Sequence, residues 1–207
     1  MAIEMIALID YNMGNLRSVV NAFDVIGEKV DIVKDPDLLK NYQKAVLPGV
    51  GAFGDAMKYL KQNGMDEAIK EFTKEKKSLL GICLGMQLLF EKSEEFGNNK
   101  GLGLIDGEVV LFDKKKFEKP LKVPHMGWNA LHIKKDSKLL KDIENGTYLY
   151  FVHSFHAKTD DKNVIGTAFY GYEFASMVEK DNIFGFQPHP EKSHKDGLKI
   201  LKNFIEL

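Results

Sequence analysis

The chain contains a single cysteine, Cys83, and its neighbours make it a candidate nucleophile. Residues 81–85 read Gly-Ile-Cys-Leu-Gly after a strand-like run, a pattern typical of a sharp strand-to-helix turn that projects its central side chain. The positive end of a helix there favours the thiolate, and the Leu84 amide could face a developing oxyanion. The alternative is a packed thiol, because a lone cysteine is usually a small buried apolar residue.

The candidate base lies late in the chain, where His189 stands between two prolines and Glu191 follows. The prolines disfavour a helix and hold the segment extended. In an extended segment residues i and i+2 point the same way, so Glu191 could orient His189. With Cys83, these residues supply every role of a catalytic triad. We expect the other histidines without a stated partner, His132, His156 and His194, to be structural.

A glycine-rich segment over residues 49–54 offers two interpretations. Its G-x-G-x-x-G pattern is typical of dinucleotide sites, but it follows the third expected strand rather than the first, and Pro48 precedes it. A glycine-rich turn can instead offer a backbone N–H to a substrate oxyanion. We favour the oxyanion interpretation.

The elements that position these groups follow from hydrophobic periodicity. The first half alternates apolar strand-like runs with helical spacing, which predicts a mostly parallel sheet covered by helices. The second half holds short strand-like runs that extend this sheet or add an antiparallel layer. Expected strands are residues 6–9, 30–33, 45–47, 78–82, 109–112, 128–133, 148–152, 164–169, 174–178 and 183–186; expected helices are residues 16–26, one or two over 55–76 interrupted near 64, 84–91 and 198–205.

Composition limits the function classes. The 207 residues are expected to form one domain over residues 1–207, with 29 basic against 30 acidic side chains. A net charge of −1 argues against a protein that coats nucleic acid or a membrane, and the Lys-rich stretch 114–122 is expected to be a solvated loop. One cysteine excludes an intrachain disulfide and zinc sites with two thiolates; we expect no metal and no cofactor. Without a signal peptide or an apolar run of roughly 18–20 residues, a cytoplasmic location is expected.

The motifs resemble a known family. Residues 81–87, together with His189-Pro190-Glu191, resemble the class I (triad) glutamine amidotransferase domain. Blocks at residues 10–18, 48–53, 125–129 and 150–155 resemble the glutaminase subunits of imidazole glycerol phosphate synthases. The resemblance runs from about residue 6 to the C-terminus. It implies an α/β, class I glutamine amidotransferase-like fold, with a central mostly parallel sheet flanked by helices and an additional smaller antiparallel sheet.

This resemblance implies glutamine hydrolysis through a γ-glutamyl thioester on Cys83, with His189 as the proton shuttle and Glu191 as its orienter. An oxyanion hole would form from Leu84 and the segment Gly49, Val50 and Gly51, after a peptide flip at Gly49–Val50. The glutamine-holding positions would be Gln87, Glu95, His153 and Ser154. For Glu95 a solvated position in an acidic run is the alternative. The family usually has an aromatic residue where Pro188 stands, which affects the packing beside His189.

The resemblance also implies a partner. Ammonia becomes ammonium in neutral water and loses its nucleophilicity, so such enzymes pass it directly to a (βα)8-barrel cyclase subunit, here for imidazole glycerol phosphate synthesis in histidine biosynthesis. The interface of this heterodimer would include Asn12, Asn15, Arg17, His125, Trp128 and Asn129, although Trp128 could equally be a core residue. One alternative is a paralogous glutaminase that serves a different synthetase, such as a sugar-amidating enzyme of surface glycan biosynthesis. Another is a non-catalytic nucleotide-binding module.

Overall fold

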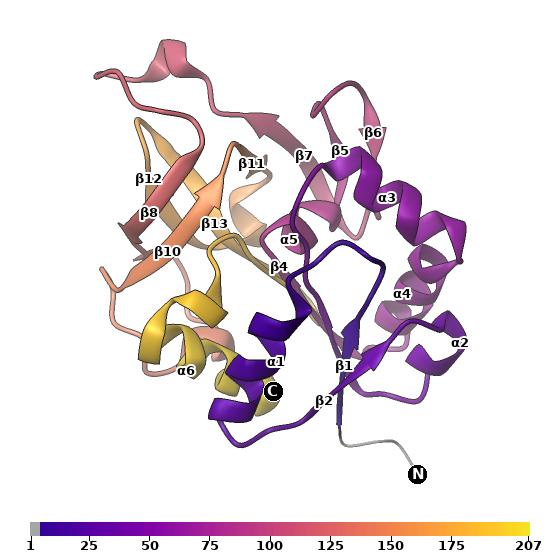
Figure 1. The fold of residues 1–207 in the computed structure, drawn as a ribbon. Helices are drawn as coiled ribbons and strands as arrows, with labels where there is room; N and C mark the ends of the chain where they lie inside the picture. The colour runs from indigo at the N-terminus through magenta and orange to yellow at the C-terminus, as the bar shows by residue number, and fades with distance from the viewer. Residues whose placement is uncertain (1–4) are drawn as a thin grey trace.

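The computed structural model describes residues 5–207, which form a large sheet with helices on both faces and a small two-stranded sheet at one side (Figure 1). One half of the large sheet is parallel, in the order β2-β1-β3-β4-β14. Its middle strands are continuous apolar runs because helices cover both of their faces. The strands are β1 (Ile6–Ile9), β2 (Val30–Val33), β3 (Lys44–Leu47), β4 (Ser78–Ile82) and β14 (Ile183–Phe186).

The other half of the sheet is mixed. It continues from β14 through β13, β11 and β7 in antiparallel steps, then to β5 in parallel and to β6, while β12 pairs with β13 and β9. The strands are β5 (Phe90–Ser93), β6 (Asn99–Lys100), β7 (Ile105–Leu111), β9 (His132–Ile133), β11 (Phe155–Lys158), β12 (Val164–Phe169) and β13 (Glu173–Lys180).

The sheet divides the core into two clusters, and helices cover one cluster on each face. Phe53 of α3 and Phe72 of α4 belong to one cluster, whereas Phe23 of α1 and Phe204 of α6 belong to the other. Gly64, at φ +77°, ends α3 and begins α4, because that conformation favours glycine. The helices are α1 (Leu16–Val25), α2 (Pro36–Leu39), α3 (Phe53–Gln62), α4 (Met65–Lys74), α5 (Leu84–Leu88) and α6 (His194–Ile205), with short 3-10 turns at Lys114–Lys116, Lys138–Leu140, Asp161–Asn163 and Pro190–Lys192.

The small sheet pairs β8 (His125–Ala130) with β10 (Tyr148–His153) in antiparallel register. His125 lies directly opposite His153, and Trp128 lies opposite Tyr150. Since side chains alternate along a strand, the histidine pair and the Trp128–Tyr150 pair occupy opposite faces. The histidine face is buried, and the other face is partly exposed.

The predicted fold class is confirmed: a large, partly parallel sheet is flanked by helices and accompanied by a smaller antiparallel sheet. The helix expected over 84–91 is wrong beyond residue 88. The carbonyls of Leu88, Leu89 and Phe90 accept hydrogen bonds from the amides of residues 102–105, so the chain leaves the helix and enters β5. The run expected at 128–133 is divided between β8 and β9, which belong to different sheets. The elements α2, β5, β6 and β11 lacked a recognised sequence signal.

Each helix within residues 5–207 is too short or too polar to span a bilayer.

Candidate active site

Cys83 occupies a strained turn between β4 and α5. Its backbone has φ 54° and ψ −111°, a conformation that costs a non-glycine residue about 1–3 kcal/mol and persists only where surrounding structure enforces it. A Cβ on Gly85 would lie 1.8 Å from the Leu47 oxygen, and one on Gly81 would lie 2.6 Å from the Gly85 oxygen. The Cys83 amide donates to the Phe186 oxygen at 2.8 Å. The two glycines therefore allow α5 to close onto β3 and β4, and the resulting turn holds the cysteine in place.

His189 is fixed through both its backbone and its ring. Its amide donates to the Tyr150 oxygen at 2.8 Å, and its carbonyl accepts from Ser193 Oγ at 2.6 Å. The ring Nδ1 lies 2.7 Å from Glu191 Oε1, and the two side chains are only 4% and 3% exposed. A carboxylate only accepts, so Nδ1 carries a proton and donates it to Glu191. Among residues 5–207, Nε2 of the same ring has no hydrogen-bond partner although it is buried.

Electrostatics favour the charged form of His189. Burial alone opposes the imidazolium, but the neighbouring Cys83 and Glu191 outweigh it and raise the pKa of His189 above its ordinary value. An imidazolium beside a thiol stabilises the thiolate, which is the nucleophilic form of cysteine. The arrangement can therefore perform nucleophilic attack and proton transfer.

A cavity of about 400 Å³ is lined by Cys83 and His189, while Glu191 lies behind the His189 ring. It brings together predicted residues from all parts of the chain. Among the residues that were not predicted, Pro124, Val152, Phe155 and Lys192 also line it. The predicted residues that line it are Val50, Gly51, Cys83, Leu84, Gln87, Glu95, His153, Ser154 and His189.

The segment after β3 forms one wall of this cavity. Gly51 has φ +103°, and within residues 5–207 the amides of Val50, Gly51 and Leu84 donate no hydrogen bond to the protein. The Pro48 carbonyl accepts from the buried Tyr11 hydroxyl at 2.9 Å. Burial, and secondarily the charge of Cys83, raises the pKa of Tyr11, so the hydroxyl keeps its proton and remains a donor.

Comparisons with known proteins identify the family of the chain. The family model described as glutamine amidotransferase class-I matches residues 7–207. The imidazole glycerol phosphate synthase subunit HisH of Sulfurimonas denitrificans is 63% identical over 98% of each chain, and that of Wolinella succinogenes is 57% identical over 98% of this chain and 100% of its own. The chain belongs to the HisH family of class I glutamine amidotransferases.

Solved structures share the fold of this HisH-family chain. One described as a glutamine amidotransferase has a TM-score of 0.74 at 15% identity and covers 97% of each chain. The PurLQS structure from Thermotoga maritima has a TM-score of 0.75 at 22% identity, with 98% of this chain and 97% of that chain covered.

In this HisH-family site, Gln87 contacts a residue that the sequence analysis missed. Gln87 Nε2 donates to the Phe155 carbonyl and to Gln187 Oε1, each at 3.0 Å. Gln187 Nε2 in turn lies 3.8 Å from Cys83 Sγ. Both Gln87 protons are thus used inside the protein, and only its carbonyl oxygen remains for a ligand. The polar residue directly after the apolar run 183–186 was the signal for Gln187.

Glu95 lines the cavity and also caps a helix. Its Oε2 accepts from the Phe53 amide at 2.6 Å, at the first residue of α3. Burial raises the pKa of Glu95, the Phe53 hydrogen bond offsets part of that shift, and Asp55 adds to it. The side chain is half-buried rather than fully solvated, and its second oxygen is available to a cationic group.

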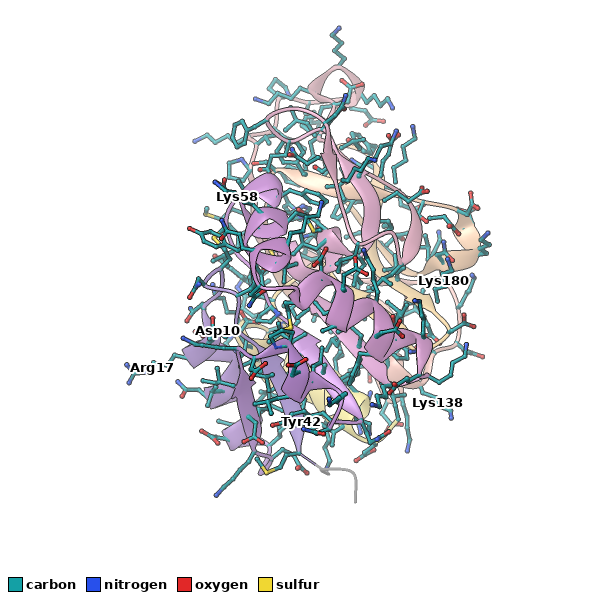
Figure 2. The ribbon with its side chains drawn as sticks, turned by 90° about the vertical axis from the view of Figure 1, so that its right-hand side faces the viewer. Asp10, Arg17, Tyr42, Lys58, Lys138 and Lys180 are labelled. Atoms are coloured by element: carbon teal, nitrogen blue, oxygen red, sulfur yellow. The ribbon has the colours of Figure 1, made fainter. Side chains whose placement is uncertain are left out.

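The residues expected at an interface fall into two groups. Asn12, Asn15 and Arg17 are exposed, and Arg17 projects away from the body of the protein (Figure 2). Asn15 also caps α1 by accepting from the Ser18 amide at 3.4 Å. A Cβ on Gly51 would lie 2.9 Å from Met13 Cε, so this loop touches the cavity wall.

The remaining expected interface residues lie on the small sheet. Trp128 is exposed and stacks on His194, with ring centroids 4.7 Å apart. His125, by contrast, is buried and bonded to other side chains, so it is not placed for direct contact with a partner. Asn129 also turns inward, toward His125 and the Phe169 carbonyl. The period-two alternation of β8 explains the difference.

Within residues 5–207, the His, Cys, Asp and Glu side chains form no cluster of three or more suited to a metal ion.

Proposed function

We propose that the chain is the glutaminase subunit of an imidazole glycerol phosphate synthase, which hydrolyses glutamine to glutamate and ammonia for histidine biosynthesis. The names of its HisH relatives support this assignment and do not favour a paralogous, sugar-amidating role. One observation carries the chemistry: Cys83 and His189 line one cavity, and the His189 Nδ1 lies 2.7 Å from Glu191 Oε1.

In the first half-reaction, the Cys83 thiolate attacks the side-chain amide carbon of glutamine, and the carbonyl electrons move onto oxygen. The free amides of Leu84 and of the Gly49–Gly51 segment would stabilise this oxyanion, after the flip at Gly49–Val50. The carbon–nitrogen bond then breaks as His189 Nε2 donates its proton to nitrogen. Ammonia leaves, and a γ-glutamyl thioester remains on Cys83.

In the second half-reaction, neutral His189 takes a proton from water as the hydroxide forms a bond to the thioester carbon. The carbon–sulfur bond breaks, glutamate leaves, and the thiolate and imidazolium are restored. Glu191 keeps the ring in place and stabilises its charge through both steps.

The cavity offers complementary groups to the amino-acid end of glutamine. The free Glu95 oxygen would accept from the substrate ammonium, as would the Gln87 carbonyl oxygen. His153 and Ser154 also line the cavity, and the backbone around them would contact the substrate. These contacts support glutamine, whose α-ammonium needs an acceptor, over a simple primary amide.

The names of the relatives imply a partner subunit, and we place it on the outer face of β8 and β10. On or beside this face Met126 is 63% exposed, Tyr148 62% and Trp128 43%. Exposed apolar clusters of this kind mark protein interfaces. The partner would be a (βα)8-barrel cyclase that receives ammonia before water protonates it, and Asn12, Asn15 and Arg17 would contribute to the same contact.

The test of the chemistry is glutamate release from glutamine, measured with and without a purified barrel subunit. Cys83→Ala should abolish glutamine-dependent synthesis and leave ammonia-dependent synthesis by the partner intact, because only glutamine hydrolysis uses the thiol. Since the chain has one cysteine, a glutamyl adduct trapped by acid and detected by mass can be assigned to Cys83. No release under either condition contradicts the glutaminase assignment; release stimulated only by another synthetase contradicts the histidine assignment.

The proposed interface is tested by measuring how surface substitutions change the affinity for the barrel partner. Trp128→Ala should weaken the complex by about tenfold or more, because exposed Trp residues are frequent interface anchors. The control is Tyr59→Ala on α3, an aromatic residue that is 40% exposed at a distance from the small sheet. Equal affinities for the two variants, measured by titration calorimetry, would contradict this placement.

A further inference from the structure

Three side chains of the small sheet form a chain of hydrogen bonds that the reaction scheme does not use. Asn129 Nδ2 lies 3.3 Å from His125 Nε2, and His125 Nδ1 lies 3.2 Å from His153 Nε2. His153 Nδ1 lies 2.8 Å from the Phe155 carbonyl oxygen. This series of hydrogen bonds thus leads from β8 to the carbonyl of Phe155, a residue that lines the catalytic cavity.

The inner end of this chain determines its direction. A carbonyl only accepts, so the proton between His153 and Phe155 belongs to His153 Nδ1. Burial, with the neighbouring histidines adding to it, lowers the pKa of His153 to about 3, which leaves the ring neutral at neutral pH. Its Nε2 is then an acceptor, and His125 Nδ1 must donate to it. Burial lowers the pKa of His125 to about 4, so its Nε2 accepts in turn.

The outer end requires the same direction independently. Asn129 Oδ1 accepts from the Ala130 amide at 2.9 Å, and Asn129 Nδ2 also donates to the Phe169 carbonyl at 2.9 Å. These two contacts fix the orientation of the amide group, so Nδ2 is the atom that faces His125. Every bond from Asn129 to Phe155 therefore points inward, and reversal of any one would bring two donors or two acceptors together.

Packing holds the two rings in this arrangement. The His125 ring stacks between Tyr170, at a centroid distance of 4.1 Å, and Phe151, at 4.9 Å. Phe112 packs against His153 at 5.2 Å. Because His125 and His153 are directly opposite in the β8–β10 register, a shift of either strand would separate their nitrogens.

From Phe155 the series of hydrogen bonds continues to the nucleophile. The Phe155 carbonyl accepts from both His153 and Gln87, which uses its two lone pairs. Gln87 also donates to Gln187 Oε1, and that bond fixes the Gln187 amide with its Nε2 toward Cys83 Sγ. A change in the position of Phe155 would thus move the group that faces the sulfur.

We propose that Asn129, His125 and His153 are positioning residues: they form a one-directional hydrogen-bond relay that sets the place of Gln187 beside the Cys83 sulfur. The proposal rests on the proposed function, in which that sulfur is the nucleophile. The relay would also connect a partner on β8 with the site, because Trp128 and Asn129 are adjacent residues with opposite orientations.

The first test needs no catalysis. Imidazole ¹⁵N shifts at pH 7.5 should show His125 and His153 neutral, with Nδ1 protonated and Nε2 bare in both rings. Protonation of either ring, or a proton on Nε2 of either neutral ring, would overturn the relay. The result does not depend on whether the chain hydrolyses glutamine.

The second test reverses one bond. Asn129→Asp replaces the donor by an acceptor of the same shape, so His125 must change its tautomer or take up a proton. The matched control is Asn145→Asp, an equal change of charge at an exposed residue whose Oδ1 accepts from the Ile133 amide, which Asp also does. We expect Asn129→Asp to lower kcat for glutamine about tenfold with KM changed less than twofold, and to change the rate of Cys83 alkylation by iodoacetamide. The control should stay within twofold.

The outcomes separate the relay from the proposed function. A folded Asn129→Asp variant with the kcat and alkylation rate of the parent overturns the relay while glutamine hydrolysis stands. Equal glutamine hydrolysis by the parent and by Cys83→Ala overturns the proposed function and leaves the tautomer measurement valid. If Asn129→Asp does not fold, the ¹⁵N shifts of the parent decide.

Discussion

Two groups of buried histidines differ in charge, although one residue of each, His189 and His153, lines the same cavity. His189 faces Glu191 and Cys83, and its pKa is raised. His153 and His125 face a carbonyl, each other and aromatic rings, and burial lowers the pKa of both. All three side chains are almost completely excluded from water.

Hydrogen-bond partners, rather than burial itself, decide the charge of these three histidines. A neighbouring carboxylate offsets the desolvation of an imidazolium, whereas a carbonyl and a neutral ring do not. His189 can therefore shuttle protons, whereas His125 and His153 can only fix the direction of the hydrogen bonds between them. Each of the following changes would alter one side of this comparison.

The largest effect is expected from Glu191→Gln, which removes the negative charge behind His189. The ring then loses both its orientation and the stabilisation of its charge, and glutamine hydrolysis should fall by roughly 10³–10⁴-fold in kcat. The measurement is glutamate release at saturating glutamine. Glu144→Gln, at an exposed loop residue, is the control; similar rates for the two variants would contradict the role of Glu191.

Acid should act on the other histidine group. Because His125 and His153 are neutral in the native state and have depressed pKa values, the unfolded chain binds more protons below pH about 6.5. The contribution of the two neutral rings to the free energy of unfolding is complete above that pH. It is lost as pH falls toward about 4 for His125 and about 3 for His153. By pH 5 each should cost about 2 kcal/mol of stability.

The measurement is the free energy of unfolding by urea between pH 7 and pH 5. This range lies above the pH at which ordinary carboxylates titrate, so their protonation does not obscure the result. His189, with its raised pKa, has the opposite sign: its contribution is present below pH about 6.5 and is lost as pH rises through the folded-state value. A free energy of unfolding that does not change from pH 7 to pH 5 would contradict the neutral state of the pair.

A smaller effect is expected from Phe112→Leu, which removes an aromatic ring that packs against His125 and His153. Phe112 is almost fully buried and contacts His125, His153 and His156. The loss should be about 1–2 kcal/mol of stability. The histidine pKa values should also rise toward the ordinary value as water approaches, which NMR titration would detect; unchanged values would show that Phe112 does not cause the shift.

The smallest effect is expected from Ser193→Ala at the junction of the two groups. Ser193 Oγ donates to the His189 carbonyl and accepts from the Tyr150 amide at 3.0 Å, so it joins the base to β10. Its loss should cost about 1 kcal/mol and lower kcat a fewfold by loosening His189. A greater loss of stability than in Phe112→Leu would reverse the order expected here.

The two histidine groups also differ in how far sequence predicts them. Cys83, His189 and Glu191 follow from local signals, because glycine spacing and flanking prolines act on adjacent residues. The His125–His153 contact depends on the register of two strands that are distant in the sequence, and the orientation of Asn129 depends on the carbonyl of Phe169. The resemblance of the block 125–129 to the family implies an interface position for His125, without information on the direction of its side chain.

The strand predictions show the same limit. The parallel half was predicted well because buried strands are continuous apolar runs. The helix expected over residues 84–91 ends early because the amides of residues 102–105 donate to the carbonyls of residues 88–90. Gln187 carries no local signal for a place beside Cys83 beyond its position after a buried strand.

The central place of β14 has a consequence for how the enzyme comes into being. This strand lies between β4 and β13, although it is the last strand of the chain. The parallel β4–β14 pairing brings Cys83 and His189 together, so the thiol has no base until residues 183–189 have left the ribosome. The nascent chain thus carries its only cysteine without hydrolytic activity, and glutamine is consumed only when the last strand has docked.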